Sequence, residues 1–180
     1  MARTFGTLGV LLVVLLLSSA ARATDQLDLS IALKTLPLLT NKMTGSTNVA
    51  VIYDPAIPAT RVDAEAIKSI LDNDLAPPDD LKLVTQLIST NQMSGMGTVK
   101  IAFLAHGLPQ SDFTTIYNAS STAGALTICT DIECVKENQC ILGIVSKPQV
   151  QVYYSASAAE AAKVTFASAF TMLAKQIRPM

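Results

Sequence analysis

Four runs rich in apolar residues divide the chain into stretches typical of buried strands. They are Val49–Tyr53, Leu81–Ile88, Val99–Ala105 and Ala125–Cys129. Runs of this length fit strands that are covered on both faces, and Asp54-Pro55 ends the first because Pro cannot donate a ladder hydrogen bond. Two further runs, Cys140–Val145 and Val150–Tyr154, flank Ser146-Lys147-Pro148-Gln149 and predict a β-hairpin.

Apolar residues at spacings of three and four predict helices between these strands. The opening segment, Leu27–Leu38, predicts a short helix that Pro37 interrupts. A Thr-x-x-acid cap at Thr60–Asp63 opens a second helix. The apolar face of that helix is formed by Val62, Ala66, Ile67, Ile70 and Leu71. Ser111–Ala123 predicts a third helix.

The last helix has the clearest pattern. Ser157-x-x-Glu160 forms a capping box. Phe166, Phe170, Leu173 and Ile177 then repeat at four, three and four, which places them on one face of a continuous helix. The polar stretches 41–48 and 91–97 predict loops.

Strands that alternate with helices imply right-handed β-α-β crossovers and a mostly parallel sheet. Residues 24–180 are therefore predicted to form a single three-layer α/β domain with a C-terminal β-hairpin and a C-terminal helix. The sequence contains no internal repeat that would suggest a different architecture.

The first 23 residues have the pattern of a secretory signal peptide. Arg3 precedes an apolar run, Leu8–Leu17, and Ala21-Arg22-Ala23 has the A-x-A form of a cleavage site. A membrane anchor is the alternative, but a helix of this length covers only about 15 Å of a hydrocarbon core that is about 30 Å thick. We expect cleavage after Ala23, export to the periplasm and no membrane insertion afterwards.

The charge balance excludes one class of partner. The 180 residues carry 13 basic and 14 acidic side chains and a formal net charge of −1. A nucleic-acid binder would need an excess of Lys and Arg. The single His and three Cys leave little material for a zinc site. No nucleic acid, metal or cofactor is expected.

Polar residues follow three of the predicted strands: Asp54, His106, and Thr130 with Asp131. Ligands of parallel sheets tend to bind outside the carboxyl ends of strands, so Asp54, His106 and Asp131 are candidate binding residues. Strands also end in turn-forming polar residues for topological reasons alone, and we favour that interpretation.

Two catalytic arrangements would have to use His106, the only imidazole. One is a Ser-His-acid hydrolase with Ser111 and Asp112, for which no Gly-x-Ser-x-Gly elbow exists. The other is a Cys-His enzyme with Cys129, for which nothing positions either group. We therefore expect that the protein is not an enzyme.

Cys129, Cys134 and Cys140 lie within twelve residues. In an oxidising compartment two of them should pair, and three pairings exist. We favour Cys134–Cys140, because Cys129 lies in a predicted buried strand while the other two bracket a loop. The bridge could respond to redox changes or act as a static staple beside an inert thiol, and the static role has the greater weight.

The order of elements from Val49 onward resembles the YfiR/HmsC-like family of periplasmic proteins. The C-terminal part carries the resemblance: Leu126-Thr127 opens a strand, Thr130-Asp131 makes an acidic turn, and the hairpin follows. Ser168 and Leu173-Ala174 fit the pattern of the final helix.

Several positions depart from the family pattern. Asn138-Gln139 replaces Gly-Gly before the hairpin, Ser155 replaces an Asn after it, and Lys163 replaces a Gly further on. The first helix lacks the usual aromatic residues. These departures concern family-specific contacts more than the fold.

The resemblance implies regulation of another protein. Members of the family repress a membrane-bound diguanylate cyclase from the periplasm, often as dimers, and some carry a paired cysteine before the hairpin, which supports Cys134–Cys140. Carried over, this chain would bind the periplasmic domain of an inner-membrane signalling protein, a diguanylate cyclase or a sensor kinase. The alternatives are a single-lobe solute-binding protein of an uptake system, because Val49–Pro58 also looks like the first strand of such proteins, and a secreted hydrolase.

Overall fold

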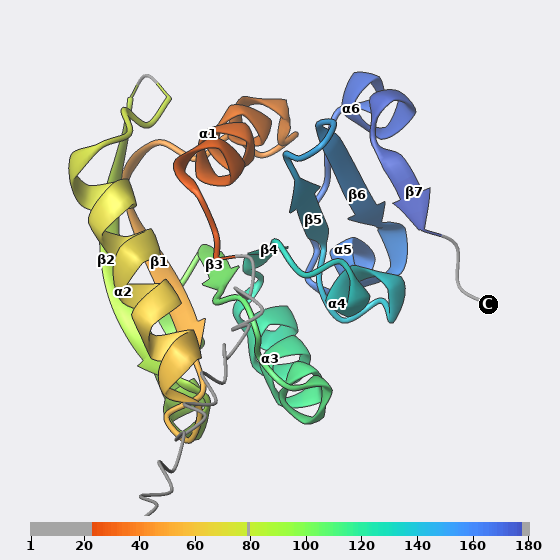
Figure 1. The fold of residues 1–180 in the computed structure, drawn as a ribbon. Coiled ribbons are helices and arrows are strands. Elements are labelled where there is room, and N and C mark those ends of the chain that lie inside the picture. The colour runs from red at the N-terminus through yellow and green to blue at the C-terminus, as the bar shows by residue number, and fades with distance from the viewer. Residues whose placement is uncertain (1–22, 79, 178–180) are drawn as a thin grey trace, which may run out of the picture.

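A computed structural model describes residues 23–78 and 80–177. The core of the fold is one seven-stranded sheet with the order β2-β1-β3-β4-β5-β6-β7 (Figure 1). The strands are β1 (Gly45–Tyr53), β2 (Leu81–Ser89), β3 (Ile101–Leu104), β4 (Leu126–Cys129), β5 (Leu142–Val145), β6 (Gln151–Ser155) and β7 (Lys175–Ile177). Neighbouring strands are parallel except for the β5–β6 hairpin.

Helices cover both faces of this sheet. They are α1 (Gln26–Thr35), α2 (Pro58–Asn73), α3 (Gln110–Ala123), α4 (Glu133–Lys136), α5 (Ala156–Ala161) and α6 (Ser168–Leu173), with 3₁₀ turns η1 (Leu36–Leu38) and η2 (Thr90–Thr98). Successive β1 side chains point to opposite faces, so Val49 and Val51 pack with α1 and α2, while Ala50 and Ile52 pack with η2, α3 and α4. The predicted α/β fold with a mostly parallel sheet and three layers is confirmed.

The signal-peptide prediction concerns residues 1–22, which lie outside the described part of the chain, and Ala23. Among the described residues, no helix has the length and apolar character needed to cross a membrane.

Helix α2 begins earlier than the sequence pattern predicts. Pro58 occupies its first turn, where the fixed φ of Pro favours a helix start, and Ile57 is the N-cap residue. The predicted cap at Thr60 is wrong, because its hydroxyl donates to the backbone carbonyl oxygens of Asp54 and Ile57. Val62 is 66% exposed, so the predicted apolar face is also shifted. The buried face consists of Thr60, Asp63, Ala64, Ile67 and Leu71.

The predicted continuous C-terminal helix is wrong. Helix α5 is capped by Ser155, whose side chain accepts from the backbone N–H of Ala158, and Ser157 is not the cap. The chain then turns at Lys163, which has a φ of 56°. Helix α6 is separate, and β7 follows it as a parallel partner of β6. The segment predicted as one helix thus forms two short helices, and β7 follows as a strand that the sequence pattern does not predict.

Two predicted loops are more ordered than expected. Strand β1 begins at Gly45 because it pairs with β2 over nine positions, from Gly45 opposite Leu81 to Tyr53 opposite Ser89. The stretch after β2 forms the 3₁₀ turns of η2, in which Met96 is buried.

Candidate functional site

The three candidate binding residues lie at one edge of the sheet. Asp54, His106 and Asp131 follow the carboxyl ends of β1, β3 and β4, which are adjacent in the sheet. The three residues therefore lie at the carboxyl edge of the sheet, as the predicted strand ends indicate. Binding of a ligand there remains a prediction.

Asp54 shapes the turn from β1 to α2. Its Oδ1 accepts from the backbone N–H of Ala56 at 2.8 Å, and its own N–H donates to Oγ1 of Thr60 at 3.0 Å. These contacts are typical of an Asx turn, in which a carboxylate replaces a backbone acceptor. The side chain of Asp54 is thus used by the local fold.

Asp131 has a similar local role at α4. Its Oδ1 accepts from the backbone N–H of Glu133 at 3.1 Å, and its carbonyl accepts from the thiol of Cys129 at 2.9 Å. An oxygen that accepts from the first N–H groups of a helix satisfies donors that have no partner within the helix. Asp131 therefore links the end of β4 to the start of α4.

His106 contacts the rest of the site through its backbone. Its N–H donates to Oδ2 of Asp63 at 2.7 Å. The ring Nδ1 is buried and has no hydrogen-bond partner among the described residues. A general base needs a neighbour that orients its ring, and the hydrogen bonds of this site supply none to Nδ1.

Asp63 is the centre of the polar network at this edge, and the sequence analysis missed it. The residue is only 6% exposed. Its carboxylate accepts from the backbone N–H of Thr24 at 2.8 Å, from the Thr24 hydroxyl at 3.0 Å and from the N–H of His106. Thr24 and Thr130 also share a hydrogen bond between their hydroxyls at 3.1 Å. The sequence holds one indication of this role: Asp63 precedes Ile67 by four residues, so the two side chains share the buried face of the helix.

A second carboxyl group lies near Asp54. Burial, together with the negative charge of Asp54, raises the pKa of Asp112 at the start of α3. Its Oδ2 is buried without a hydrogen-bond partner among the described residues. The pair Asp54–Asp112 makes this corner of the sheet edge negative.

The three cysteines form one buried cluster. Cys134 and Cys140 are joined by a disulfide with a Cα–Cα distance of 5.3 Å, as predicted, and Cys129 is free and buried. Their sulfur atoms lie within 4.8 Å of one another. Two of these sulfurs are used by the bridge, so the cluster does not offer three thiolates to a metal ion.

The environment of Cys129 disfavours its thiolate form. Burial, and to a lesser degree the charge of Asp131, raises the pKa of Cys129 strongly. The thiolate is the nucleophile in thiol–disulfide exchange, so attack by Cys129 on the neighbouring bridge is slow. Both bridged cysteines are buried as well, which restricts access of a reductant.

The described interior at this edge has little space for a solute. A cavity of about 10 Å³ is lined by residues that include Thr24, Asp28, Cys129 and Thr130. This volume is close to the least that holds one water molecule.

An apolar groove opens on the surface between α1, the start of β6, and the segment from α6 to β7. We call it the C-terminal groove. It has a volume of about 420 Å³, and its lining includes Lys34, Leu38, Val150, Phe170, Leu173 and Lys175. Leu38, Val150 and Leu173 are 38%, 51% and 87% exposed. Among the described residues that line the groove, none is acidic.

Comparison with known proteins supports the fold. No protein-family model and no curated protein matches the chain. It is similar to the crystal structure of a conserved domain protein from Vibrio cholerae, with a TM-score of 0.60 and 13% sequence identity. The match covers 85% of this chain but only 60% of that one. At this identity the likeness shows the fold alone.

Proposed function

We propose that this protein is an exported regulator that binds the extracytoplasmic domain of a membrane signalling protein through the C-terminal groove. The exposed apolar side chains of Leu38, Val150 and Leu173 around one groove carry this proposal. Contiguous exposed apolar surface with polar neighbours is typical of protein interaction sites.

The charges beside the groove indicate the chemistry of the partner. Lys34 is an exposed lining residue. Lys175 also contributes to the lining, but its ammonium lies over the ring of Tyr153 at 5.1 Å, and Tyr153 faces the opposite side of the sheet from Val152. Opposite charges steer encounter and fix register at interfaces. Lys34, together with the absence of acidic residues from the described lining, favours a partner segment that combines apolar side chains with acidic residues.

Export is the second part of the proposal. The Arg3, apolar run and Ala21-Arg22-Ala23 pattern supports a cleaved leader. The Cys134–Cys140 bridge supports an oxidising compartment such as the periplasm. Because the bridge is buried and the thiolate form of Cys129 is disfavoured, a static staple has more support than a fast redox switch.

The structure also supports the resemblance to the YfiR/HmsC-like family at two departures. Asn138 and Lys163 stand where that family carries Gly, and they have φ values of 58° and 56°. This left-handed region favours Gly, so a Gly at either position would suit the backbone of this chain. Oδ1 of Asn138 also accepts from the hydroxyl of Ser155 at 2.8 Å, which joins two of the departures.

The alternatives have weaker support. A solute-binding protein needs a cavity of a few hundred Å³ lined by convergent polar groups. Here Asp54 and Asp131 accept from nearby backbone N–H groups, and the cavity beside Thr24 and Thr130 has a volume of only about 10 Å³. A hydrolase would need an oriented His106, and we expect that replacing it by Ala leaves the regulatory activity intact.

The level of cyclic di-GMP in cells tests the proposal for a diguanylate cyclase partner. A strain that lacks the protein should contain more of this messenger, and the wild-type gene should restore the normal level. Leu173→Glu should fail to restore it, because a charge at the groove is incompatible with an apolar contact. Val62→Glu, at an exposed apolar site on α2 outside the groove, should restore it. Equal behaviour of the two variants would contradict a role for the groove.

A further inference from the structure

The backbone nitrogen of Thr24 lies in an unusual environment for a residue so close to the start of the chain. Thr24 is 6% exposed, whereas Ala23 before it is exposed. The Thr24 nitrogen donates to Oδ1 of Asp63 at 2.8 Å. A carboxylate as buried as Asp63 is costly unless a positive charge or several donors compensate it.

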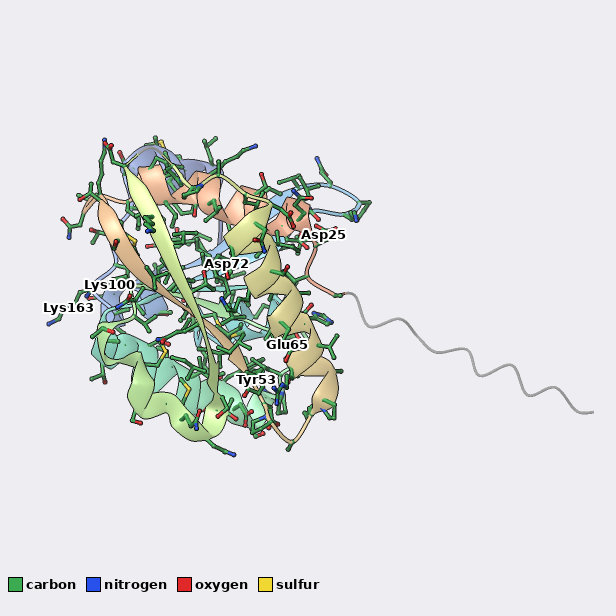
Figure 2. All side chains as sticks on the ribbon, turned by 90° about the vertical axis from the view of Figure 1, so that its left-hand side faces the viewer. Asp25, Tyr53, Glu65, Asp72, Lys100 and Lys163 are labelled. Carbon is green, nitrogen blue, oxygen red and sulfur yellow. A yellow bond between two sulfur atoms is a disulfide. The ribbon has the colours of Figure 1, made fainter. Side chains whose placement is uncertain are left out.

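Asp63 has hydrogen-bond donors, but no described basic side chain forms an ion pair with it. It accepts three hydrogen bonds, two of them from Thr24 and one from the backbone of His106. The ion pairs found among residues 23–78 and 80–177 use the carboxylates of Asp25, Glu65, Asp72 and Glu133 instead. Figure 2 shows Glu65 and Asp72 on α2, where their basic partners precede them by one turn. Asp63 is on the buried side of the same helix.

A second buried acid lies close by. Asp28 is 3% exposed, and it lines the same small cavity as Thr24. Its Oδ2 accepts from the N–H of Asp25 at 3.1 Å, but its Oδ1 is buried without a partner among the described residues. Two buried carboxylates therefore flank Thr24, and one of them has an unused acceptor.

We propose that removal of the leader converts the Thr24 nitrogen into the missing cation, so that the new α-ammonium group forms a buried ion pair with Asp63. This inference rests on the proposed export and on cleavage after Ala23. A signal peptidase adds water across the Ala23–Thr24 peptide bond, which leaves the carboxylate on the leader and an amine on Thr24. The amine takes a proton at neutral pH, since an α-amino group usually titrates near 8.

The change from amide to ammonium strengthens the contact in two ways. A charged donor makes a shorter and stronger hydrogen bond to a carboxylate than a neutral N–H does. The ammonium also has further hydrogens, and Asp28, whose Oδ1 has no partner among the described residues, lines the same cavity of about 10 Å³ as Thr24. The mature domain is therefore more stable than the same domain with its Thr24 nitrogen in a peptide bond.

The first measurement identifies the N-terminus. The protein is isolated from the periplasm, and its intact mass is determined. A mass that begins at Thr24 agrees with the proposed cleavage. Any other N-terminus overturns the inference, because the Thr24 nitrogen then remains an amide or is lost, and this result also corrects the proposed cleavage site without bearing on the groove.

The second measurement tests the ion pair itself by urea unfolding. The chain beginning at Thr24 is prepared with its α-amine free or Nα-acetylated, in the wild-type, Asp63→Asn and Asp72→Asn backgrounds. Acetylation should lower the ratio of folded to unfolded protein at least tenfold in the wild type and in Asp72→Asn, and less than twofold in Asp63→Asn. An equal effect in all three backgrounds, or none in the wild type, overturns the inference.

A further readout applies if Asp63→Asn does not fold. The free α-amine of the wild-type chain should react with an acylating reagent at neutral pH at least tenfold more slowly in buffer than in urea, relative to the lysines. An α-amine that reacts equally fast in both solvents is not buried against Asp63 and overturns the proposal.

Discussion

Leu39 and Phe166 form an antiparallel β-bridge that joins the end of the first helical segment to the C-terminal segment. Two backbone hydrogen bonds flank it, from Thr40 to the carbonyl of Thr165 and from Ala167 to the carbonyl of Leu38, both at 2.8 Å. This bridge needs an extended backbone at Phe166. The extended segment lies between the turn at Lys163 and the start of α6, so the predicted helix cannot be continuous here.

Replacing Phe166 by Ala should destabilise the domain by about 3–5 kcal/mol, the usual cost of removing a buried aromatic ring. The Phe166 ring stacks on Phe170 at 4.3 Å and meets the edge of Tyr154 at 5.7 Å. Urea unfolding measures the change. Met172→Ala is the matched control on α6, because Met172 is 82% exposed and should change stability by less than about 0.5 kcal/mol.

Thiol titration should find one reactive sulfhydryl, and only after unfolding. Cys129 is buried and its pKa is raised strongly, so the native protein should resist thiol reagents. In urea without reductant a single thiol should react, and with reductant three should react. Two or more thiols in unreduced protein taken from the periplasm would argue against a stable Cys134–Cys140 bridge.

Removing the bridge should lower stability without changing the fold. The double variant Cys134→Ser, Cys140→Ser opens a short loop and should cost about 2 kcal/mol in the chain-entropy treatment, measured by urea unfolding. If the bridge is a staple and not a switch, this variant should still bind the proposed partner at temperatures where it is folded. Loss of binding in a fully folded variant would support a redox-sensing role.

Asp112→Asn should stabilise the protein at neutral pH. Burial and the charge of Asp54 raise the pKa of Asp112, so its protonated form is favoured in the folded state. The stability that the carboxyl group contributes is present below its unfolded pKa, near 4, and is lost as the pH rises through the folded value. The gain from the variant should appear over that range and stay below about 1 kcal/mol, because the group is partly exposed.

Unfolding at a series of pH values checks this. Glu160→Gln, an exposed change on α5, is the control and should show no such dependence. At pH 3 the Asp112 side chain is mostly protonated, so it is neutral like Asn. A gain in stability that is already present at pH 3 would contradict an electrostatic cause.

Much of the fold could be predicted because the strands of a parallel sheet bury both faces. Val49–Tyr53 and Val99–Ala105 are apolar runs, and both strands are found there, although β1 begins four residues earlier than predicted, at Gly45. The C-terminal segment could not be predicted, because the spacing of Phe166 and Phe170 suits a helix equally well. Only the distant contact with Leu39 selects the extended backbone.

The site shows the same division. Asp54 and His106 could be placed at one sheet edge from topology alone, and the Cys134–Cys140 bridge followed from the position of Cys129 in a strand. The Thr-x-x-acid pattern at Thr60–Asp63 predicts that Asp63 is part of a helix cap, and the acid of such a cap usually lies at the surface. The sequence therefore does not indicate that Asp63 is buried. Its partner Thr24 comes from a segment that has no local pattern.

The most direct test of the central claim is capture of the partner from the envelope. Affinity-tagged wild-type protein, Leu173→Glu and Val62→Glu are expressed in the native host, and membrane proteins retained by each are quantified. We predict that the wild type and Val62→Glu retain the same membrane signalling protein through its extracytoplasmic domain, and that Leu173→Glu loses it at least tenfold. Retention of no membrane protein by the wild type, or equal retention by both variants, would contradict regulation through the C-terminal groove.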